Sequence, residues 1–285
     1  MKQLKKIKMK TILLPTDFSI NSINAINYAI ELYKNETCKF YLLNVQRASS
    51  FISDDMMAVT STATIYNTII DAAKKSLFNI IKRINNHYNN PKHTFETLVD
   101  YDNFIDSINQ VSELKQIDLI IMGTKGATGL KQVVFGSNTV KVIQRCHLPV
   151  LVIPENCKFS NLKDVTFTTS YATLYEGDDL NPLKDIITLN QSKLSVLHVF
   201  CDYDFAVELD KNIDFFNENF EHPDFKNLTT NEEDVFEIIE NYIKDNNVKM
   251  LAMKYKSHSL FERLFYKLKI ESVAYSINIP LLVIK

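Results

Sequence analysis

Residues 117–139 read Ile-Asp-Leu-Ile-Ile-Met-Gly-Thr-Lys-Gly-Ala-Thr-Gly-Leu-Lys-Gln-Val-Val-Phe-Gly-Ser-Asn-Thr, and this stretch decides the fold. It begins with a short apolar run typical of a buried parallel strand, and it leads into residues 140–145, which have the pattern of a helix. The chain has only five glycines in 285 residues, and four of them lie between Gly123 and Gly136. The sequence therefore predicts a strand, a glycine-rich loop and a helix in succession.

A strand, glycine loop and helix in this order predict a phosphate-binding site. Glycine lets the main chain approach a ligand closely, and the N-H groups at a helix start attract anions. The loop is not a Walker loop, because no Gly-Lys-Ser/Thr follows the first glycine at the required spacing. It does not have the G-x-G-x-x-G spacing either.

The glycine spacing is Gly123-x2-Gly126-x9-Gly136-Ser137. This pattern resembles the nucleotide-binding signature of the universal stress protein family. Residues 12–17 (Ile-Leu-Leu-Pro-Thr-Asp) are similar to the first strand of that family with its terminal aspartate, and residues 148–154 (Leu-Pro-Val-Leu-Val-Ile-Pro) are similar to its last strand. Three separate matches in the correct order make the resemblance specific.

Apolar strands alternate with helical patterns through this half of the chain. We expect strands at residues 10–16, 39–45, 94–99, 117–122 and 150–153. We expect helices through residues 23–33, 65–84, 105–111 and 140–145, with Ser19 or Asn21 and Asp102 or Asn103 as caps of the first and third. The pattern predicts an α/β fold with an open parallel sheet, Rossmann-like and covered on both faces. The resemblance implies the adenine nucleotide alpha hydrolase-like form of that fold.

The second half of the chain repeats the first. A shift of 131 residues lays Met253 to Ser257 on Met122 to Gly126 and continues without a gap to Pro280 on Pro149. A shift of 153 lays residues 165–170 on residues 12–17, and residues 193–200 form a further expected strand. Thr230 and Glu233 have the spacing of a capping box that opens a helix reaching Tyr242. We predict two tandem domains, 1–154 and 163–285, joined near residues 155–162.

The second domain has lost the glycine motif. Lys254, Ser257 and Lys267 stand where Gly123, Gly126 and Gly136 stand in the first domain, and Ser170 replaces Asp17. Side chains there take up the space that phosphates need, so we expect only the first domain to bind nucleotide. A cationic pocket for another anion is an alternative to solvated lysines, which are the favoured interpretation. Its members would be Lys254, Lys256, His258, Lys267 and Lys269.

The resemblance implies a role for each site residue. Asp17 would bind ribose hydroxyls or help to hold a metal, and the backbone of Val45 would contact the adenine edge. Gly123 and Gly126 would lie against ribose and α-phosphate, while residues 136–139 would donate to the outer phosphates. Two simpler roles stay open, with Asp17 as a helix cap and Lys125 as a solvated side chain. The full predicted set is Pro15, Thr16, Asp17, Val45, Met122, Gly123, Lys125, Gly126, Gly136, Ser137, Asn138 and Thr139.

The sequence offers no catalytic machinery that we can name. It shows no nucleophile with a base, no paired catalytic carboxylates and no Walker-type lysine. The resemblance implies binding of ATP, with or without Mg²⁺, and at most slow hydrolysis. We therefore interpret the chain as a nucleotide-responsive stress or regulatory protein that acts on an unknown protein partner. The alternatives are an interaction scaffold without nucleotide and a slow ATP hydrolase.

Composition narrows the class of protein. The net charge of -2 argues against nucleic acid as the main partner, and the lysines at residues 2–10 are best interpreted as a solvated tail. The apolar run at residues 12–14 is too short for a signal peptide or a membrane span, so we expect a cytoplasmic protein with no membrane contact. Cys38, Cys146, Cys157 and Cys201 show no C-x2-C pair, so neither a zinc site nor a disulfide framework is indicated.

The last strands of the two domains are apolar, at residues 150–153 and 281–284. In relatives built from one domain, such strands pair between two subunits. A tandem chain can satisfy this pairing internally and so cover two sheet edges at once. We therefore predict an internal pseudo-dimer, and further association into a homodimer stays open.

Overall fold

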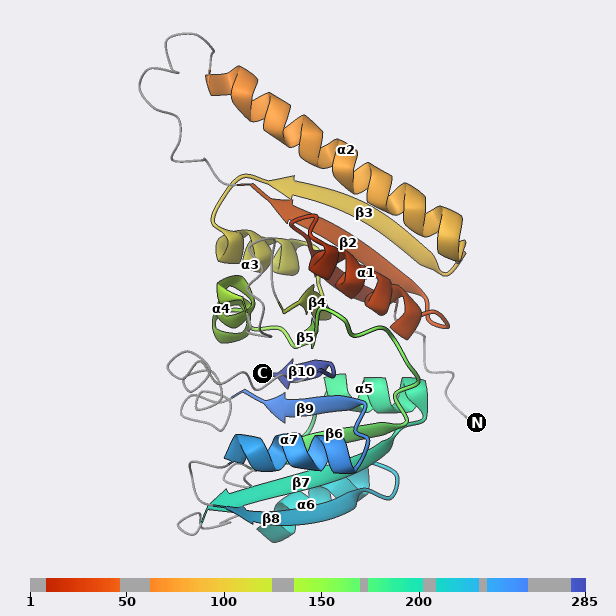
Figure 1. Cartoon of the computed structure of the whole chain (residues 1–285), viewed down its shortest axis with the longest axis vertical. Coiled ribbons are helices and arrows are strands. Elements are labelled where there is room, and N and C mark those ends of the chain that lie inside the picture. The colour runs from red at the N-terminus through yellow and green to blue at the C-terminus, as the bar shows by residue number, and fades with distance from the viewer. Residues whose placement is uncertain are drawn as a thin grey trace.

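A computed structural model describes residues 9–46, 62–124, 136–169, 174–201, 209–230, 235–255 and 278–285. Their strands form one ten-stranded sheet in the order β3-β2-β1-β4-β5-β10-β9-β6-β7-β8 (Figure 1). The elements of the first half are β1 Lys10–Pro15, α1 Ile20–Leu32, β2 Cys38–Val45, α2 Thr62–Tyr88, β3 His93–Asp100, α3 Phe104–Leu114, β4 Leu119–Gly123, α4 Ser137–Arg145 and β5 Val150–Ile153. Those of the second half are β6 Asp164–Thr169, α5 Asn181–Asn190, β7 Lys193–Cys201, α6 Leu209–Asn219, β8 Asp224–Thr230, α7 Val235–Asp245, β9 Met250–Lys254 and β10 Leu281–Ile284.

The two half-sheets have the same strand order, read outward from the middle. Within each half all neighbouring strands are parallel. The halves meet where β5 pairs with β10, and this pairing is antiparallel, with Leu151 opposite Leu282 and Val150 opposite Val283. The predicted α/β fold and the predicted pairing of the two terminal strands are therefore confirmed.

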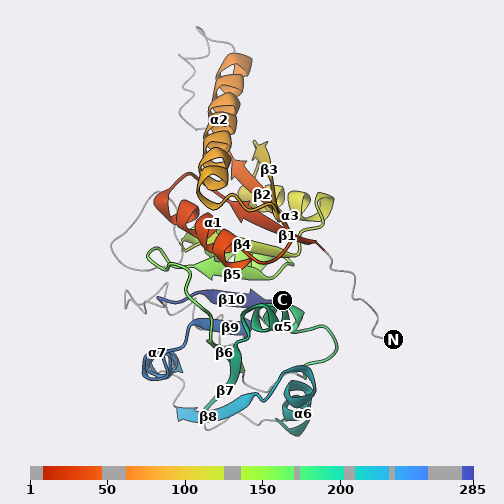
Figure 2. The same cartoon turned by 90° about the vertical axis from the view of Figure 1, so that its right-hand side faces the viewer.

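Helices cover both faces of the sheet (Figure 2). Side chains along β1 alternate between two hydrophobic cores, because successive residues of a strand point to opposite faces. Ile12 and Leu14 belong to the core that includes α1 and α2, whereas Leu13 belongs to the core that includes α3 and α4. Burial on both faces explains why the strands are continuous apolar runs. The first core also includes Phe167 and Leu282, so it continues across the junction of the halves.

Local capping follows the sequence in the first half. Ser19 is the N-cap of α1 and its Oγ accepts from the Ser22 N-H at 3.3 Å, while Asn103 caps α3 by accepting from the Ile105 N-H at 3.0 Å. Helix α4 begins at Ser137, one turn earlier than the pattern predicted. Thr230 lies at the end of β8 and Glu233 lies outside the described residues, so the capping box stays a prediction.

The connections contain two further findings. The predicted loop at residues 46–60 lies outside the described residues except for Gln46. The segment between β5 and β6 is tied to α1, because the Asn24 side-chain amide donates to the carbonyls of Pro154 at 3.2 Å and Cys157 at 3.0 Å.

In the part of the chain that the structure describes, no helix combines the length and apolarity that a membrane crossing requires.

The continuous core predicts that the two halves unfold together. Leu282→Ala removes a fully buried side chain at the junction and should cost about 2–5 kcal/mol, because a cavity remains in the core that the two halves share. We expect one thermal transition, shifted down by several degrees, in calorimetry. Leu114→Ala is the control, since Leu114 is 72% exposed and should leave the midpoint nearly unchanged. Two separate transitions would contradict a shared core.

Candidate functional site

The predicted site lies at the topological switch point of the first half-sheet. β1 pairs with β2 on one side and with β4 on the other, and in such sheets ligands bind beyond the carboxyl ends of the strands. Thr16, Val45 and Gly123 all lie at or just past the carboxyl ends of these three strands. The three strand ends that carry predicted site residues are therefore neighbours in the sheet, and ligand binding there stays a prediction.

The turn from β1 into α1 is held by short hydrogen bonds. Thr16 is buried, and its hydroxyl bonds the Ser22 hydroxyl at 2.8 Å and accepts from the Phe18 N-H at 3.0 Å. Phe18 itself has a left-handed backbone, with φ of 67°. Asp17 is exposed, and its Oδ1 accepts from the Ser19 N-H at 3.1 Å and the Ser19 hydroxyl at 2.5 Å. Asp17 thus supports the helix cap, while Ser19 is the cap itself.

Sequence reasoning did not select two polar residues at the end of β2, Asn44 and Gln46. Asn44 is 3% exposed, and its side-chain amide donates to the Thr16 carbonyl at 2.7 Å. The Gln46 amide donates to the Asn44 Oδ1 at 2.5 Å. These bonds fix the ends of β1 and β2 relative to one another, on either side of Val45. The available signal was an asparagine inside an otherwise apolar strand, because a buried amide requires partners.

Gly123 is required by protein packing as well as by the motif. A Cβ at this position would lie 3.1 Å from the carbonyl oxygen of Asn21 and 3.2 Å from its carbonyl carbon. The absent side chain therefore lets the first turn of α1 pack against the end of β4. The close approach of this main chain to ribose stays a prediction.

Two buried oxygen atoms beside this contact have no hydrogen-bond partner among the described residues. They are the Oδ1 of Asn21 and the Oγ1 of Thr124, whose residues are 5% and 1% exposed. An unpaired buried polar atom costs roughly 1–3 kcal/mol, so each of these two oxygens calls for a partner such as water or a ligand. Sequence reasoning did not select either residue. We add both to the candidate site.

Helix α4 begins at the same edge with a cap that has no side chain. Its N-cap is Gly136, whose N-H donates to the Thr124 carbonyl at 2.5 Å. The Thr139 hydroxyl is buried and lies 3.0 Å from the Gly123 carbonyl and 3.2 Å from the Thr124 carbonyl. The Thr139 hydroxyl thus holds the first turn of α4 against the end of β4, and its contact with phosphate stays a prediction. Ser137 and Asn138 are exposed in the first turn.

The remaining predicted residues divide into two groups. Pro15 and Met122 are buried, and Met122 packs in the core beneath α3 and α4. Lys125 and Gly126 lie outside the described residues, so the loop between Thr124 and Gly136 stays a prediction. Among the described residues, no three His, Cys, Asp or Glu side chains gather in a way that would hold a metal ion.

The corresponding edge of the second half is filled by side chains. Lys254 ends β9, and its ammonium lies 2.6 Å from Asp179 Oδ2 and 5.6 Å from the centre of the Tyr175 ring. Tyr175 is buried, with its hydroxyl 2.8 Å from Thr169 Oγ1 and its N-H donating to Asn212 Oδ1 at 2.9 Å. The charge of Lys254 is thus paired within the protein. The other residues of the alternative cationic pocket, Lys256, His258, Lys267 and Lys269, lie outside the described residues.

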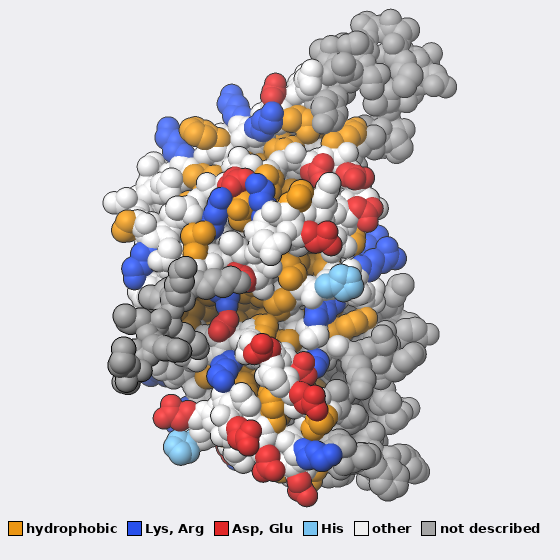
Figure 3. All heavy atoms as spheres, turned by 180° about the vertical axis from the view of Figure 1, so that it is seen from behind, with side chains coloured by type: hydrophobic (Ala, Val, Ile, Leu, Met, Phe, Trp, Pro, Cys, Tyr) orange, Lys and Arg blue, Asp and Glu red, His pale blue; other side chains and the backbone are white. Residues whose placement is uncertain are grey.

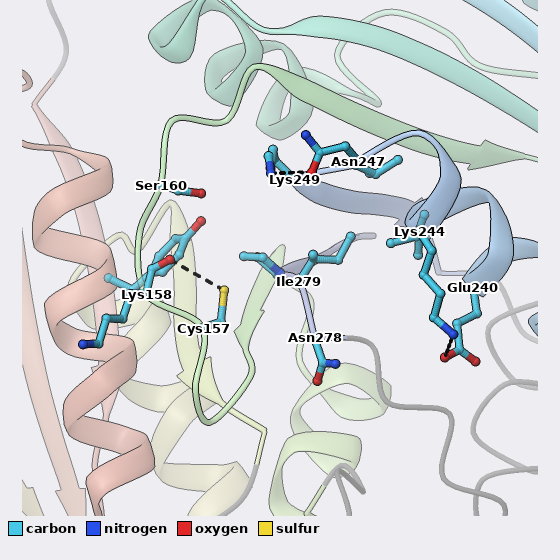
Figure 4. A pocket seen from close by; sticks show the side chains of 13 residues that line it. Cys157, Lys158, Ser160, Glu240, Lys244, Asn247, Lys249, Asn278 and Ile279 are labelled. Carbon is cyan, nitrogen blue, oxygen red and sulfur yellow. Dashed lines mark hydrogen bonds and ion pairs between the residues drawn. The ribbon is translucent and has the colours of Figure 1, made fainter.

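A separate hollow of about 370 Å³ lies between the two halves (Figure 4). Its charged side chains do not converge on one point. Lys158 and Lys244 extend toward opposite sides of the view, Lys244 pairs with Glu240 at 2.9 Å, and Lys249 donates to the Asn247 amide oxygen at 2.7 Å. On the face in Figure 3, acidic and basic side chains are interspersed. The edge of β1 and β4 is therefore the better candidate.

Comparisons with known proteins identify the family of this chain. The model of the universal stress protein family matches residues 8–154, slightly more than half of the 285-residue chain. The chain belongs to this family. Universal stress protein MJ0531 of Methanocaldococcus jannaschii is 32% identical over 144 residues, which are 50% of this chain and 81% of that protein. Universal stress protein MJ0577 of the same organism is 24% identical over 159 residues, which are 52% and 96%.

A solved structure extends the likeness to both halves. The crystal structure of a universal stress protein from Archaeoglobus fulgidus superposes with a TM-score of 0.70 and 17% identity. The match covers 98% of this chain and 99% of that one. At this identity the likeness shows the fold, and the fold it shows spans both half-sheets.

The contact at Gly123 predicts a loss of stability on adding one methyl group. Gly123→Ala in this universal stress protein should cost about 1–3 kcal/mol, because α1 or β4 must shift to relieve the contact with Asn21. Thermal unfolding measures the change. Gly177→Asn is the control, since Gly177 has φ of 50° with no atom within 4 Å of an added Cβ, and asparagine tolerates that backbone. An unchanged midpoint for Gly123→Ala would contradict the packing role.

Proposed function

We propose that the first half of this universal stress protein binds an adenine nucleotide, with ATP as the ligand, at the carboxyl edge between β1 and β4. The observation that carries the proposal is the start of α4. A glycine N-cap without a side chain opens the helix, and Thr139 holds that first turn against the end of β4. An uncapped helix start at a switch point supplies N-H donors for an anion. The glycine spacing of the family signature supports phosphate as that anion.

The surrounding groups fit the other parts of a nucleotide. The exposed first turn of α4, at Ser137 and Asn138, would donate to the phosphates. The exposed carboxylate of Asp17 would accept from ribose hydroxyls, and the backbone at Val45 would meet the adenine edge. A Mg²⁺ ion bound to the phosphates would take Asp17 as its protein ligand, because Mg²⁺ in nucleotide sites commonly uses one or two carboxylates together with phosphate oxygens.

The second half would bind no nucleotide in this manner. A ligand at the end of β9 would have to displace the Lys254 ammonium from Asp179 and the ring of Tyr175. We therefore propose two unequal domains, 1–154 and 163–285, with one nucleotide per chain. The protein would act as a nucleotide-responsive regulator whose surface a protein partner recognises, and the cytoplasm is its proposed location. Among the described residues at this edge, no nucleophile is paired with a base, and turnover is not part of the proposal.

Titration of the purified chain with ATP tests the proposal. We expect one equivalent of ATP to bind the wild-type chain. Gly136→Lys should abolish the heat, since its side chain would stand at the mouth of the α4 N-terminus and occupy the phosphate position. Gly177→Asn, in the connection before α5, is the matched glycine control and should bind like the wild type. Binding of two equivalents, or equal binding by Gly136→Lys, would place the ligand elsewhere.

A further inference from the structure

We infer that Lys285, which follows the last strand of the second half, is a positioning residue for helix α4 of the first half. Its ammonium group donates to the carbonyl oxygen of Ile143. Ile143 lies in the last turn of α4, which ends at Arg145. The last four carbonyls of a helix lack partners within the helix, so this donor satisfies a group that would otherwise be unpaired.

Strand direction explains how a residue from the second half reaches this helix. β10 runs antiparallel to β5, with Val283 opposite Val150. The carboxyl end of β10 therefore lies beside the start of β5, and α4 ends just before β5 begins. Lys285 is the residue that follows Ile284 at this point. The same pairing that joins the half-sheets thus delivers a lysine to the end of α4.

The ammonium group of Lys285 lies beside an aromatic ring and is charged at pH 7. Its ammonium lies 4.3 Å from the centre of the ring of Tyr255, the residue after β9. Burial lowers the pKa of Lys285 to about 8, and the neighbouring Cys146 opposes part of this shift. Burial also raises the pKa of the Cys146 thiol to about 11, so the thiol is neutral and the ammonium is charged at pH 7. A cation at a helix C-terminus is favourable because it complements the helix dipole.

The equivalent position of the first half cannot make the same contact. At a shift of 131 residues, Lys285 corresponds to Pro154 in the first half. Proline has neither a side-chain donor nor a backbone N-H, so Pro154 cannot make the reciprocal bond to the second half. The half without the glycine motif therefore supports the half that carries it. Lys285 binds one end of α4 while Thr139 fixes the other end, at the proposed phosphate site.

Amide hydrogen exchange of the nucleotide-free protein tests the positioning role without any ligand. Lys285→Met keeps most of the apolar length and removes the donor and the charge. We expect amides of residues 137–145 to exchange about twofold to tenfold faster, the range that a partly buried helix-end cation contributes. Lys285→Arg should restore slow exchange, because arginine keeps both the donor and the charge. Lys249→Met, in the same half but bonded to Asn247, is the control and should leave α4 unchanged.

The effect on ATP binding rests on the proposed function, and the two can fail separately. Lys285→Met should weaken ATP binding about twofold to tenfold by calorimetry, with Lys285→Arg near wild type. If the wild type binds no ATP, the proposed function fails and the exchange result alone decides the role of Lys285. Unchanged exchange at residues 137–145, or equal acceleration by Met and Arg, would overturn the inference. Circular dichroism checks folding, and Lys285→Gln replaces Met in both measurements if Met does not fold.

Discussion

Strands β5 and β10 would each be an exposed apolar edge if they did not pair with one another. Each strand is fully buried and has a parallel neighbour on its other side. An open edge of this kind invites pairing with other chains, so a tandem chain that pairs its own edges removes two such surfaces at once. The pairing also lets Leu151 and Leu282 share one core. Both the extent of the sheet and the position of α4 relative to the second half depend on this contact.

The first half could be predicted closely because its signals are local. Strands buried on both faces are apolar without interruption, and Ser19 and Asn103 precede their helices as caps. The second half gave weaker signals between residues 170 and 230. The described side chains of β8, an edge strand, are exposed or half-buried, and α5 starts at a proline-containing turn with Leu180 as its cap. β8 therefore lacks the continuous apolar pattern, and α5 lacks the side-chain cap, that sequence reasoning uses.

The details of the site depend on contacts between residues distant in sequence. Gly123 is explained by Asn21, which lies on a different element, and Lys254 is neutralised by Asp179 across 75 positions. The glycine motif predicted where a ligand would lie, but it did not distinguish a glycine required by the ligand from one required by a neighbouring helix. Likewise a lysine in a sequence gives no sign of whether its charge is free. Only the folded arrangement shows that Lys254 is already paired.

The two halves therefore use the same strand order for different purposes. At the carboxyl edge of β1, β2 and β4, buried hydroxyl and amide groups such as Thr16, Asn44 and Thr139 bond the main chain, and the N-cap of α4 is a glycine without a side chain. At the end of β9, the ion pair of Lys254 with Asp179 closes the equivalent position. A partly buried ammonium requires a partner, and Asp179 supplies it to the lysine that stands where the first half has Gly123. Because Lys285 then binds α4 from this closed half, the half without a glycine motif contributes structure to the half that has one.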